Sequence, residues 1–579
     1  MPKLAEKIGS GLGAIGVGLL WAAAFPKLGV ASLAWLAPAG LLLAAAGWKR
    51  PFLAGYVGGL VFWLVSIHWL LFIPVPFYPI LGWVALSAFA ALYSAAWVWL
   101  CCRALGPRRG SGSSPLSTSQ HEKDYRLGAD GSENLLTSVP NVHTPRMQLP
   151  KGWGHRLGWA LFCAASWVAL EMIQARLFSG FPWNLLGTSQ YQMLPLLQVA
   201  SVTGVYGVSF LIVWVSVSLW LAGDALWRNP SHRLAWSRDF LVPLLALALL
   251  ATWGLRRTAS LPPPARVLKL ALIQPSIPQA MIWDDRASAQ RFRQLLELSE
   301  AALATRPDLL VWPEAAVPKL LCYDREVFEP ITNLVRTHGV WMICGADDVE
   351  LRPSVPGRPA EPDYFNASFL ISPRGELVAT YRKRKLVIFG EYVPLADWLP
   401  FLKRLTPITG SFTAGPGPVP FVAPELGIRT ATLICFEDIF PHTARESAGA
   451  DLDFLLNLTN DGWFGEGAAQ WQQAAASVFR AIENDLPLVR CANNGLTCWV
   501  DARGGLHEIY FGDSGDIYGR GFKTALIPLR PHGATRASTF YHRHGDWFGW
   551  ACVAVCAAGW AAAEHNKRSR PAMASPPLR

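Results

Sequence analysis

Long apolar runs without charged residues constrain the fold of this chain more than any other feature. Most of the runs approach the ~20 residues that cross a hydrocarbon core. They occupy residues 9–26, 28–47, 52–74, 79–102, 157–175, 202–222, 239–255 and the vicinity of 545–563. Hydrophobic residues make up 52% of the 579 residues, and charged residues only 16%. The sequence therefore predicts a multi-span α-helical membrane bundle of about seven helices in residues 1–256, with a final span at 543–565.

Lysine and arginine gather beside alternate spans, which predicts the orientation of the bundle. The clusters are Lys3 and Lys7, Lys49 and Arg50, Arg103 with Arg108 and Arg109, Arg228 with Arg233 and Arg238, and Lys567 with Arg568 and Arg570. With eight spans they share one face, and basic loops stay in the cytoplasm. Arg256 and Arg257 oppose this assignment, because they follow the seventh span on the other face. We expect cytoplasmic termini, including the tail 566–579, and residues 266–535 outside.

The net charge of +10 follows from this topology, because basic residues on the cytoplasmic face meet anionic lipid. No nucleic-acid-binding module is recognisable, so we expect the lipid bilayer as a partner and no nucleic acid. Residues 104–155 are rich in Gly, Ser and Pro, which predicts a disordered cytoplasmic loop.

Residues 266–535 alternate short apolar runs with helical patterns, which indicates an α/β layered domain. The predicted strands are 268–273, 308–312, 340–344, 367–371, 430–434, 454–458 and 488–491. The predicted helices are 285–305, 324–338 and 469–485. In open α/β sheets the reactive groups gather beyond the strand ends, where Glu314 and Cys435 stand.

Glu314, Lys383 and Cys435 form a set that can perform acyl transfer. Only a thiolate attacks well, so a cysteine needs a base, which Glu314 can supply. A lysine can stabilise both the thiolate and the oxyanion of a tetrahedral intermediate. Glu391 and Glu437 are further carboxylates that could hold Lys383 or share the proton transfers. The set needs no metal and no cofactor, and we expect neither.

The sequence motifs around these residues resemble those of the nitrilase superfamily, over about residues 266–530. The matching segments are Pro313-Glu314, the lysine segment 381–391, Cys435-Phe436-Glu437, Asn460-Asp461-Gly462-Trp463-Phe464-Gly465 and Arg490-Cys491-Ala492-Asn493-Asn494-Gly495. The resemblance implies an αββα sandwich with a Glu-Lys-Cys triad made of Glu314, Lys383 and Cys435.

Together with the membrane spans, the whole chain resembles the bacterial apolipoprotein N-acyltransferases. The membrane segment 180–187 (GFPWNLLG), Ile277-Pro278-Gln279 and Trp283-Asp284 are similar to signatures of that family. The resemblance implies transfer of an acyl chain from a phospholipid, commonly phosphatidylethanolamine, through a cysteine thioester. The implied acceptor is the α-amino group of the diacylglyceryl-modified first cysteine of apolipoproteins. It also implies a bacterial cytoplasmic (inner) membrane, with the catalytic domain on the periplasmic side.

The same resemblance suggests roles for further residues. Phe436, like Glu391 and Glu437, is expected to support catalysis or the oxyanion. Trp283, Asn460 and Trp463 are expected to contact substrate. Trp283 is equally consistent with an ordinary core tryptophan. Three positions depart from the pattern of the family, namely Ile388, Phe436 and Gln473, and none of them removes an atom of the triad.

Two other functions remain open at this point. A membrane-tethered amidase would use the same triad with water as the acceptor, although one helix would suffice to anchor it. A lipid-binding scaffold or transporter with a retired catalytic domain would have no chemical reason to keep the intact triad.

Overall fold

A computed structural model describes most of the chain. The described residues are 2–105, 147, 149–228, 230–231, 233–260, 263–282, 284–352, 362–395, 398–399, 401, 411–449, 451–512, 515–531, 534 and 536–568. Most of the expected disordered loop 104–155, the tail from residue 569 onward and Trp283 lie outside these residues.

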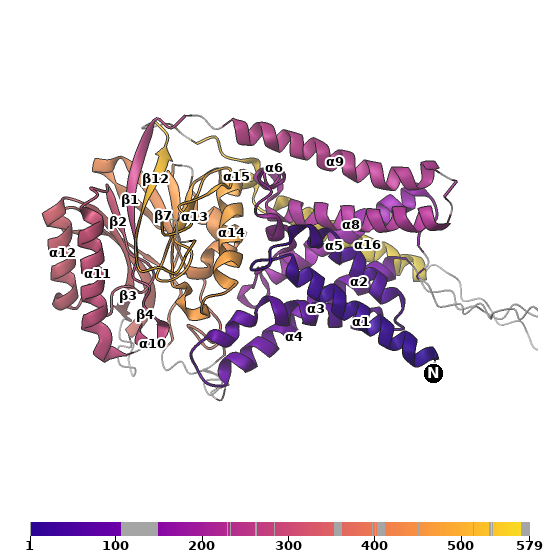
Figure 1. Ribbon diagram of the computed structural model, residues 1–579, viewed down its shortest axis with the longest axis horizontal. Coiled ribbons are helices and arrows are strands. Elements are labelled where there is room, and N and C mark those ends of the chain that lie inside the picture. The colour runs from indigo at the N-terminus through magenta and orange to yellow at the C-terminus, as the bar shows by residue number, and fades with distance from the viewer. Residues whose placement is uncertain are drawn as a thin grey trace, which may run out of the picture.

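Every predicted apolar run contains a helix. These helices are α1 (Pro2–Ala23), α2 (Ala37–Ala46), α3 (Pro51–Ser66), α4 (Tyr78–Ala104), α5 (Trp153–Gln174), α8 (Val205–Arg228), α9 (Arg233–Ala259) and α16 (Trp547–Arg568). Two short helices, α6 (Leu194–Leu197) and α7 (Ala200–Thr203), precede α8. The helices lie together in one bundle beside the α/β domain (Figure 1).

Four helices in the described part of the chain are long and apolar enough to cross a membrane: α4, α5, α8 and residues 236–259 of α9. By contrast α2 has 10 residues. At about 1.5 Å per residue it spans about 15 Å, half of a hydrocarbon core of about 30 Å. The predicted count of eight spans therefore stays a prediction.

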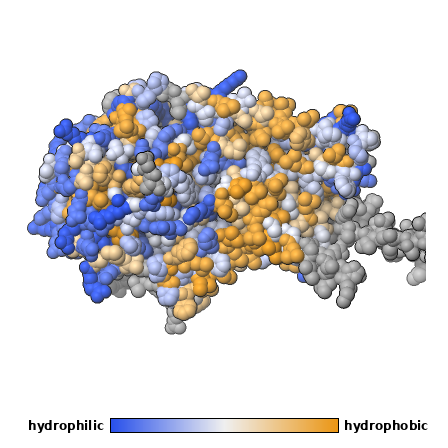
Figure 2. Space-filling view, in the orientation of Figure 1, coloured by the Kyte–Doolittle hydropathy of each residue, from blue (hydrophilic) through white to orange (hydrophobic). Residues whose placement is uncertain are grey.

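The surface of the bundle is apolar, unlike that of the α/β domain. Figure 2 shows hydrophobic residues gathered over the bundle and hydrophilic residues over the opposite end of the molecule. Helix α9 exposes Leu241, Leu245 and Leu249. Its apolar window is only 17% buried, whereas that of the neighbouring α8 is 78% buried. Helix α9 therefore turns leucines outward, as lipid-facing helices do.

The α/β domain contains two six-stranded sheets. The first has the order β12-β1-β2-β3-β4-β5, with β1 (Arg266–Gln274), β2 (Leu309–Val311), β3 (Trp341–Leu351), β4 (Pro362–Ile371), β5 (Leu377–Arg382) and β12 (Gly521–Leu529). The second has the order β11-β10-β9-β8-β7-β6, with β6 (Pro420–Ala423), β7 (Ile428–Ile434), β8 (Phe454–Thr459), β9 (Leu488–Ala492), β10 (Cys498–Val500) and β11 (Leu506–His507).

Four layers form this domain, as predicted. Side chains from both sheets, including Leu270 and Leu456, form one apolar core between them. A second core joins the first sheet to α11 (Ser288–Leu303) and α12 (Arg325–His338), which lie on the side away from the bundle (Figure 1). Helices α13 (Pro441–Ser447) and α14 (Ala469–Asn484) belong to the opposite layer, toward the bundle. The short helix α10 (Gln279–Ile282) lies between β1 and α11 in the chain, and α15 (Phe540–His544) directly precedes α16.

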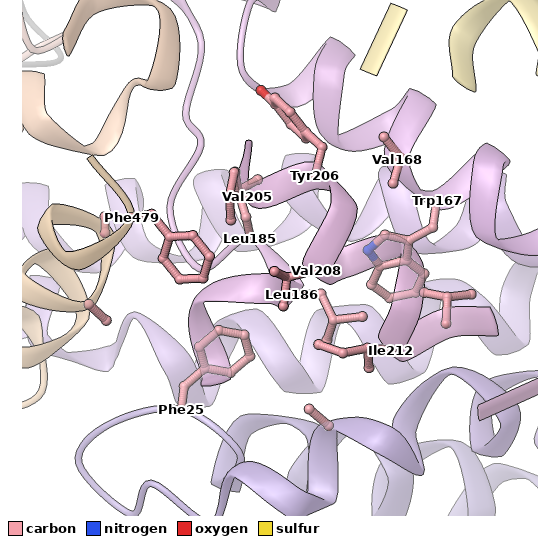
Figure 3. Close-up of a cluster of buried hydrophobic side chains, with 14 of the residues drawn as sticks. Phe25, Trp167, Val168, Leu185, Leu186, Val205, Tyr206, Val208, Ile212 and Phe479 are labelled. Atoms are coloured by element: carbon pink, nitrogen blue, oxygen red, sulfur yellow. The ribbon is translucent and has the colours of Figure 1, made fainter. Parts of the chain in front are cut away.

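Helix α14 lies between the second sheet and the bundle. Every residue of α14 except Trp471 is buried. Its Phe479 belongs to a cluster that also contains Leu185 and Val205 of the membrane part (Figure 3). One continuous apolar core therefore joins the two halves of the molecule.

A polar contact fixes the same junction. Glu483 of α14 accepts a hydrogen bond from the Val205 N–H, 2.9 Å away, at the first residue of α8. A carboxylate at this position satisfies an otherwise free helix N–H and complements the helix dipole. Gly204 precedes it with φ +68°, and a Cβ there would lie 2.6 Å from the ring of Tyr541. Only glycine therefore allows this close approach.

Candidate active site

Three strand ends bring the predicted triad residues to one edge of the sandwich. Glu314 follows β2 after two residues, Lys383 follows β5 directly, and Cys435 follows β7 directly. Strands β2 and β5 belong to the first sheet and β7 to the second. The hydroxyls of Ser368 on β4 and Thr432 on β7 lie 2.7 Å apart and link the two sheets near this edge. The site is thus assembled from both sheets.

Lys383 lies between two carboxylates. Its Nζ is 2.8 Å from Glu391 Oε1 and 3.3 Å from Glu314 Oε1. Asn366 Nδ2 donates to the same two oxygens, at 2.8 Å to Glu314 and 3.1 Å to Glu391. The backbone N–H of Asn460 donates to Glu314 Oε2 at 2.9 Å. Both oxygens of Glu314 are therefore oriented, and Lys383 is 1% exposed.

The backbone of Glu314 rests directly on β3. A Cβ at Gly345 would lie 2.4 Å from the Pro313 carbonyl oxygen and 2.7 Å from Glu314 Cα. Any larger residue at position 345 would have to displace the loop that carries Glu314. Gly345 therefore helps to place the carboxylate of Glu314.

Cys435 stands on a tight turn between β7 and the helical turn η8 (Cys435–Ile439). Its φ of +55° is a conformation that residues with a side chain rarely adopt. Two amides hold the turn, because Asn457 Nδ2 and Gln473 Nε2 donate to the Cys435 carbonyl oxygen at 2.8 and 2.9 Å. Strain of this kind is common where a reactive side chain must be presented.

The charges around Cys435 act in opposite directions. Burial and the nearby Glu314 carboxylate raise the pKa of the Cys435 thiol well above its usual value, although Lys383 opposes this shift. Burial acts against the ammonium of Lys383, but Glu391 and Glu314 outweigh it and raise the pKa of Lys383. At neutral pH the resting site therefore holds a protonated thiol beside a charged lysine, and attack requires a base.

Glu437 holds the site together from a fully buried position. Its Oε1 accepts from the N–H groups of Arg384 and Lys385 at 2.7 and 2.9 Å. Its Oε2 accepts from the Ile434 N–H and the Tyr381 hydroxyl, both at 2.8 Å. Glu437 thus joins the backbone after Lys383 to the strand before Cys435, and its carboxylate is occupied by these four donors. Burial raises the pKa of Glu437.

The remaining predicted site residues in the described part of the chain are Phe436, Asn460 and Trp463, and each lies in a different environment. The ring of Phe436 lies 5.5 Å from Lys383 Nζ, and its supporting role in catalysis stays a prediction. The Asn460 side chain is buried, donates to Gln279 Oε1 at 2.9 Å and accepts from Asn493 Nδ2 at 2.9 Å. These bonds fix the residue whose backbone N–H donates to Glu314, and its predicted contact with substrate stays a prediction. Trp463 is partly buried on the turn η9 (Asp461–Phe464).

Four polar residues near the reacting groups were missed by the sequence reasoning. Asn366, Asn457 and Gln473 make the contacts described above. Asp347 on β3 pairs in register with Asn366, and burial together with Glu314 and Glu391 raises its pKa to about 6. Asn366 and Asn457 could have been noticed as polar residues inside apolar strands, because a buried amide needs partners.

Among the described residues, no group of three or more His, Cys, Asp or Glu side chains is arranged to hold a metal ion. All ten cysteines are free thiols.

Two family models match the chain. The carbon-nitrogen hydrolase model matches residues 269–547, and the apolipoprotein N-acyltransferase N-terminal domain model matches residues 17–120 and 136–218. The first match and the two sheets agree with the predicted nitrilase-like fold. An amidase from Nesterenkonia sp. has a TM-score of 0.32 and 17% identity, over 45% of this chain and 90% of the amidase.

Curated relatives agree across both halves of the molecule. The apolipoprotein N-acyltransferase of Geobacter metallireducens is 34% identical over 557 residues, which cover 93% of this chain and 92% of that relative. The apolipoprotein N-acyltransferase of Brucella melitensis is 34% identical over 360 residues, which cover 61% of this chain and 65% of that relative. The chain belongs to the apolipoprotein N-acyltransferase family.

Proposed function

We propose that this acyltransferase moves a fatty acyl chain from a membrane phospholipid to lipoproteins through a thioester on Cys435. The proposed donor is phosphatidylethanolamine. The proposed acceptor is the α-amino group of the diacylglyceryl-modified first cysteine of apolipoproteins. The proposed setting is the bacterial cytoplasmic membrane, with residues 266–535 on the periplasmic side.

One observation supports lipid substrates above all others. Gln472 and Gln473 are neighbours on α14, and they contact different halves of the molecule. Gln473 donates to the Cys435 carbonyl oxygen at 2.9 Å. Gln472 Oε1 accepts from the indoles of Trp69 and Trp183 of the membrane part at 3.0 and 2.7 Å. The candidate nucleophile is therefore separated from the bundle by a single helix, and this closeness to the membrane part supports lipid substrates.

In the proposed first half-reaction, Cys435 Sγ attacks the carbonyl carbon of the phospholipid ester while Glu314 takes the thiol proton. Lys383 stabilises the oxyanion, and a preorganised charge of this kind often supplies a large share of catalysis. When the intermediate collapses, the ester C–O bond breaks and Glu314 returns the proton to the departing lysophospholipid oxygen. The acyl chain remains on Cys435 as a thioester.

The second half-reaction uses the same groups in reverse. The acceptor amine attacks the thioester carbonyl carbon, and Glu314 takes a proton from its nitrogen. The C–S bond then breaks, an amide forms, and the proton returns to the sulfur of Cys435. Asn366 and Glu391 keep Glu314 and Lys383 in place through both steps.

The intact mass of the purified protein after incubation with phosphatidylethanolamine alone tests this proposal. We expect a gain of one fatty acyl group that hydroxylamine removes, in the native protein and in Cys491→Ala but not in Cys435→Ala. Cys491 is the matched control, because it is a buried thiol of the same domain on strand β9. Adding a diacylglyceryl peptide should then discharge the thioester.

A folded native protein that gains no acyl mass would contradict the thioester proposal. Turnover of small amides by that protein would instead support an amidase. An adduct on Cys435→Ala would refute the assignment of the nucleophile.

A further inference from the structure

A small cavity lies inside the bundle, between α1, α3, α4, α5 and the segment that follows α5. Its volume is about 30 Å³, and its walls include the indoles of Trp63, Trp97 and Trp167. A single buried water needs ~10–15 Å³ measured in this way. The cavity can therefore hold a polar group of one or two non-hydrogen atoms, but not a phosphate or a sugar.

Four polar atoms of the cavity walls accept or donate no hydrogen bond within the described residues. They are Glu171 Oε2, Asn184 Oδ1, the Tyr93 hydroxyl and Trp21 Nε1. Glu171 is 5% exposed and Asn184 is 7% exposed. Leaving such buried groups unpaired costs about 1–3 kcal/mol each, and more for a charged group. Their collection in one cavity therefore indicates a bound polar group.

The remaining atoms of these side chains are fixed by the fold. Glu171 Oε1 accepts from Trp167 Nε1 at 3.0 Å and from the Leu186 N–H at 2.8 Å, and the Ser209 hydroxyl lies beside the carboxylate. Asn184 Nδ2 donates to Ser66 Oγ at 2.6 Å. These bonds of Glu171 Oε1 and Asn184 Nδ2 fix the two side chains. The unbonded Glu171 Oε2 and Asn184 Oδ1 are therefore held in place at the cavity wall.

The free atoms at the centre favour a cation. A carboxylate oxygen and an amide oxygen are both acceptors, and the Tyr93 hydroxyl can accept as well. The walls contain no Lys, Arg or His that could neutralise Glu171. Indole faces attract cations, most strongly when the cation is desolvated. An ammonium group has the size of a water molecule and three N–H donors for these three acceptors. Trp21 Nε1 is a donor and needs a separate acceptor, and the cavity volume leaves room for one water to serve as that acceptor.

We propose that this cavity binds the primary ammonium group of the aminophospholipid donor, an inference that rests on the proposed function. The amine of the acceptor does not fit this site, because that nitrogen must attack the thioester on Cys435. A series of contacts links the cavity wall to the turn that carries Cys435. Asn184 follows Trp183, whose indole donates to Gln472 of α14, and the next residue, Gln473, contacts Cys435.

Glu171→Gln is the informative variant. The glutamine carbonyl can keep the hydrogen bonds to Trp167 and Leu186, whereas its NH₂ replaces the free acceptor with a donor that repels an ammonium group. Cys163→Ala is the matched control, because Cys163 is buried on the same helix and does not line the cavity. Tyr93→Phe removes only a hydroxyl from the cavity wall and provides a second, milder variant.

The experiment measures each half-reaction separately in detergent micelles. Glu171→Gln should weaken use of phosphatidylethanolamine in thioester formation about 10-fold or more and leave phosphatidylglycerol unchanged. Discharge of the preformed acyl-enzyme by a diacylglyceryl peptide should be unchanged, because the amine of the peptide reacts at Cys435. This pattern supports an ammonium site for the donor.

Three outcomes would overturn the inference. Equal losses with phosphatidylethanolamine and phosphatidylglycerol, without an effect on the acceptor, would assign Glu171 a structural role only. No effect on either half-reaction would remove the site. If no thioester forms at all, native mass spectrometry with an equimolar mixture of phosphatidylethanolamine and phosphatidylglycerol still tests whether the cavity binds an ammonium group. Cys435→Ala should then retain phosphatidylethanolamine preferentially, and Cys435→Ala with Glu171→Gln should lose that preference. Equal retention by both proteins would refute the site independently of the proposed reaction.

Discussion

Two buried clusters with the same composition of charges flank Cys435. In the lysine cluster, Lys383 lies between Glu314 and Glu391 at the edge of the first sheet. In the arginine cluster, Arg490 on β9 lies between Asp438 and Asp461 at the second sheet. Each cluster contains two carboxylates and one cation.

The surroundings of the two clusters differ. Asp438 also accepts from Ser477 Oγ at 2.6 Å and from Gln473 Nε2 at 2.9 Å, and Arg490 is fully buried. A guanidinium is always charged and offers its donors in a rigid fork, whereas an ammonium is a compact charge with three rotatable donors. The arginine cluster therefore suits permanent support of the nucleophile turn, and the lysine cluster suits chemistry. The two clusters have the same number of carboxylates and cations. They differ in the type of cation, and this difference accounts for the roles that we assign to them.

The largest expected effect is on stability, at the arginine cluster. Arg490→Met would leave Asp438 and Asp461 buried without the cation that contacts both of them and should lower the free energy of unfolding by about 3–5 kcal/mol. Thermal unfolding in detergent measures this change, with Arg374→Met, at an exposed arginine of the same domain, as the control. Unchanged thermal stability together with lost thioester formation would reverse the roles that we assign to the two clusters.

Lys383→Met should have the next largest effect, on chemistry. Removing the charge that stabilises the oxyanion should slow thioester formation about 100- to 1,000-fold. Lys383→Arg should be similarly slow, because the rigid fork cannot replace a compact ammonium in a site where the native side chain is 1% exposed. The measurement is single-turnover acylation followed by intact mass. A Lys383→Arg enzyme with near-native rate would show that any cation suffices here.

Glu391→Gln should cause a smaller loss of rate. It removes one carboxylate from Lys383, while Asn366 and Glu314 still contact each other. We expect acylation to slow about 10- to 100-fold, since a charge-assisted hydrogen bond contributes about 1.5–3 kcal/mol. Glu376→Gln, at an exposed residue before β5, is the control. An unaffected rate would mean that Glu314 alone orients Lys383.

The sequence predicted Glu314, Lys383 and Cys435 as one reactive set from their chemistry, and the resemblance then added the matching motifs. Glu314 and Cys435 follow apolar strands that were correctly recognised, so their place at the sheet edge was expected. Strand β5 was not among the predicted strands, so the place of Lys383 rested on the chemistry of the set and on its motif. Glu437 was predicted as a possible partner of Lys383, whereas it accepts from the N–H groups of Arg384, Lys385 and Ile434 and from the Tyr381 hydroxyl. Asn366 was out of reach as a positioning residue, because its role depends on the pairing of strands that are distant in sequence.

The membrane part shows a similar limit. The apolar run 28–47 indicates a full span, but residues 31–35 form a 3₁₀ turn and α2 begins only at Ala37, with proline in its first turn. Apolar composition predicts that a segment avoids water, whereas helix length also depends on where proline and tight turns start the helix. Eight apolar segments were therefore predictable, and their individual lengths were not.

The smallest expected effect concerns the pKa of Cys435, which separates the contributions of the lysine cluster. Because Glu314 raises this pKa and Lys383 lowers it, Glu314→Gln should lower it and Lys383→Met should raise it further. The thiolate fraction at pH 8, and with it alkylation by iodoacetamide, should therefore fall in the order Glu314→Gln, native protein, Lys383→Met. A change of one pKa unit alters the rate about 10-fold well below the pKa.

Peptide-resolved mass spectrometry can follow Cys435 separately from the exposed Cys322. Because the pKa of Cys435 is raised in the native protein, its alkylation should still increase with pH above 8. A plateau below pH 7 would mean that the resting site holds a thiolate. Lys383 would then dominate over burial and Glu314, and the lysine cluster would activate the nucleophile before any substrate binds.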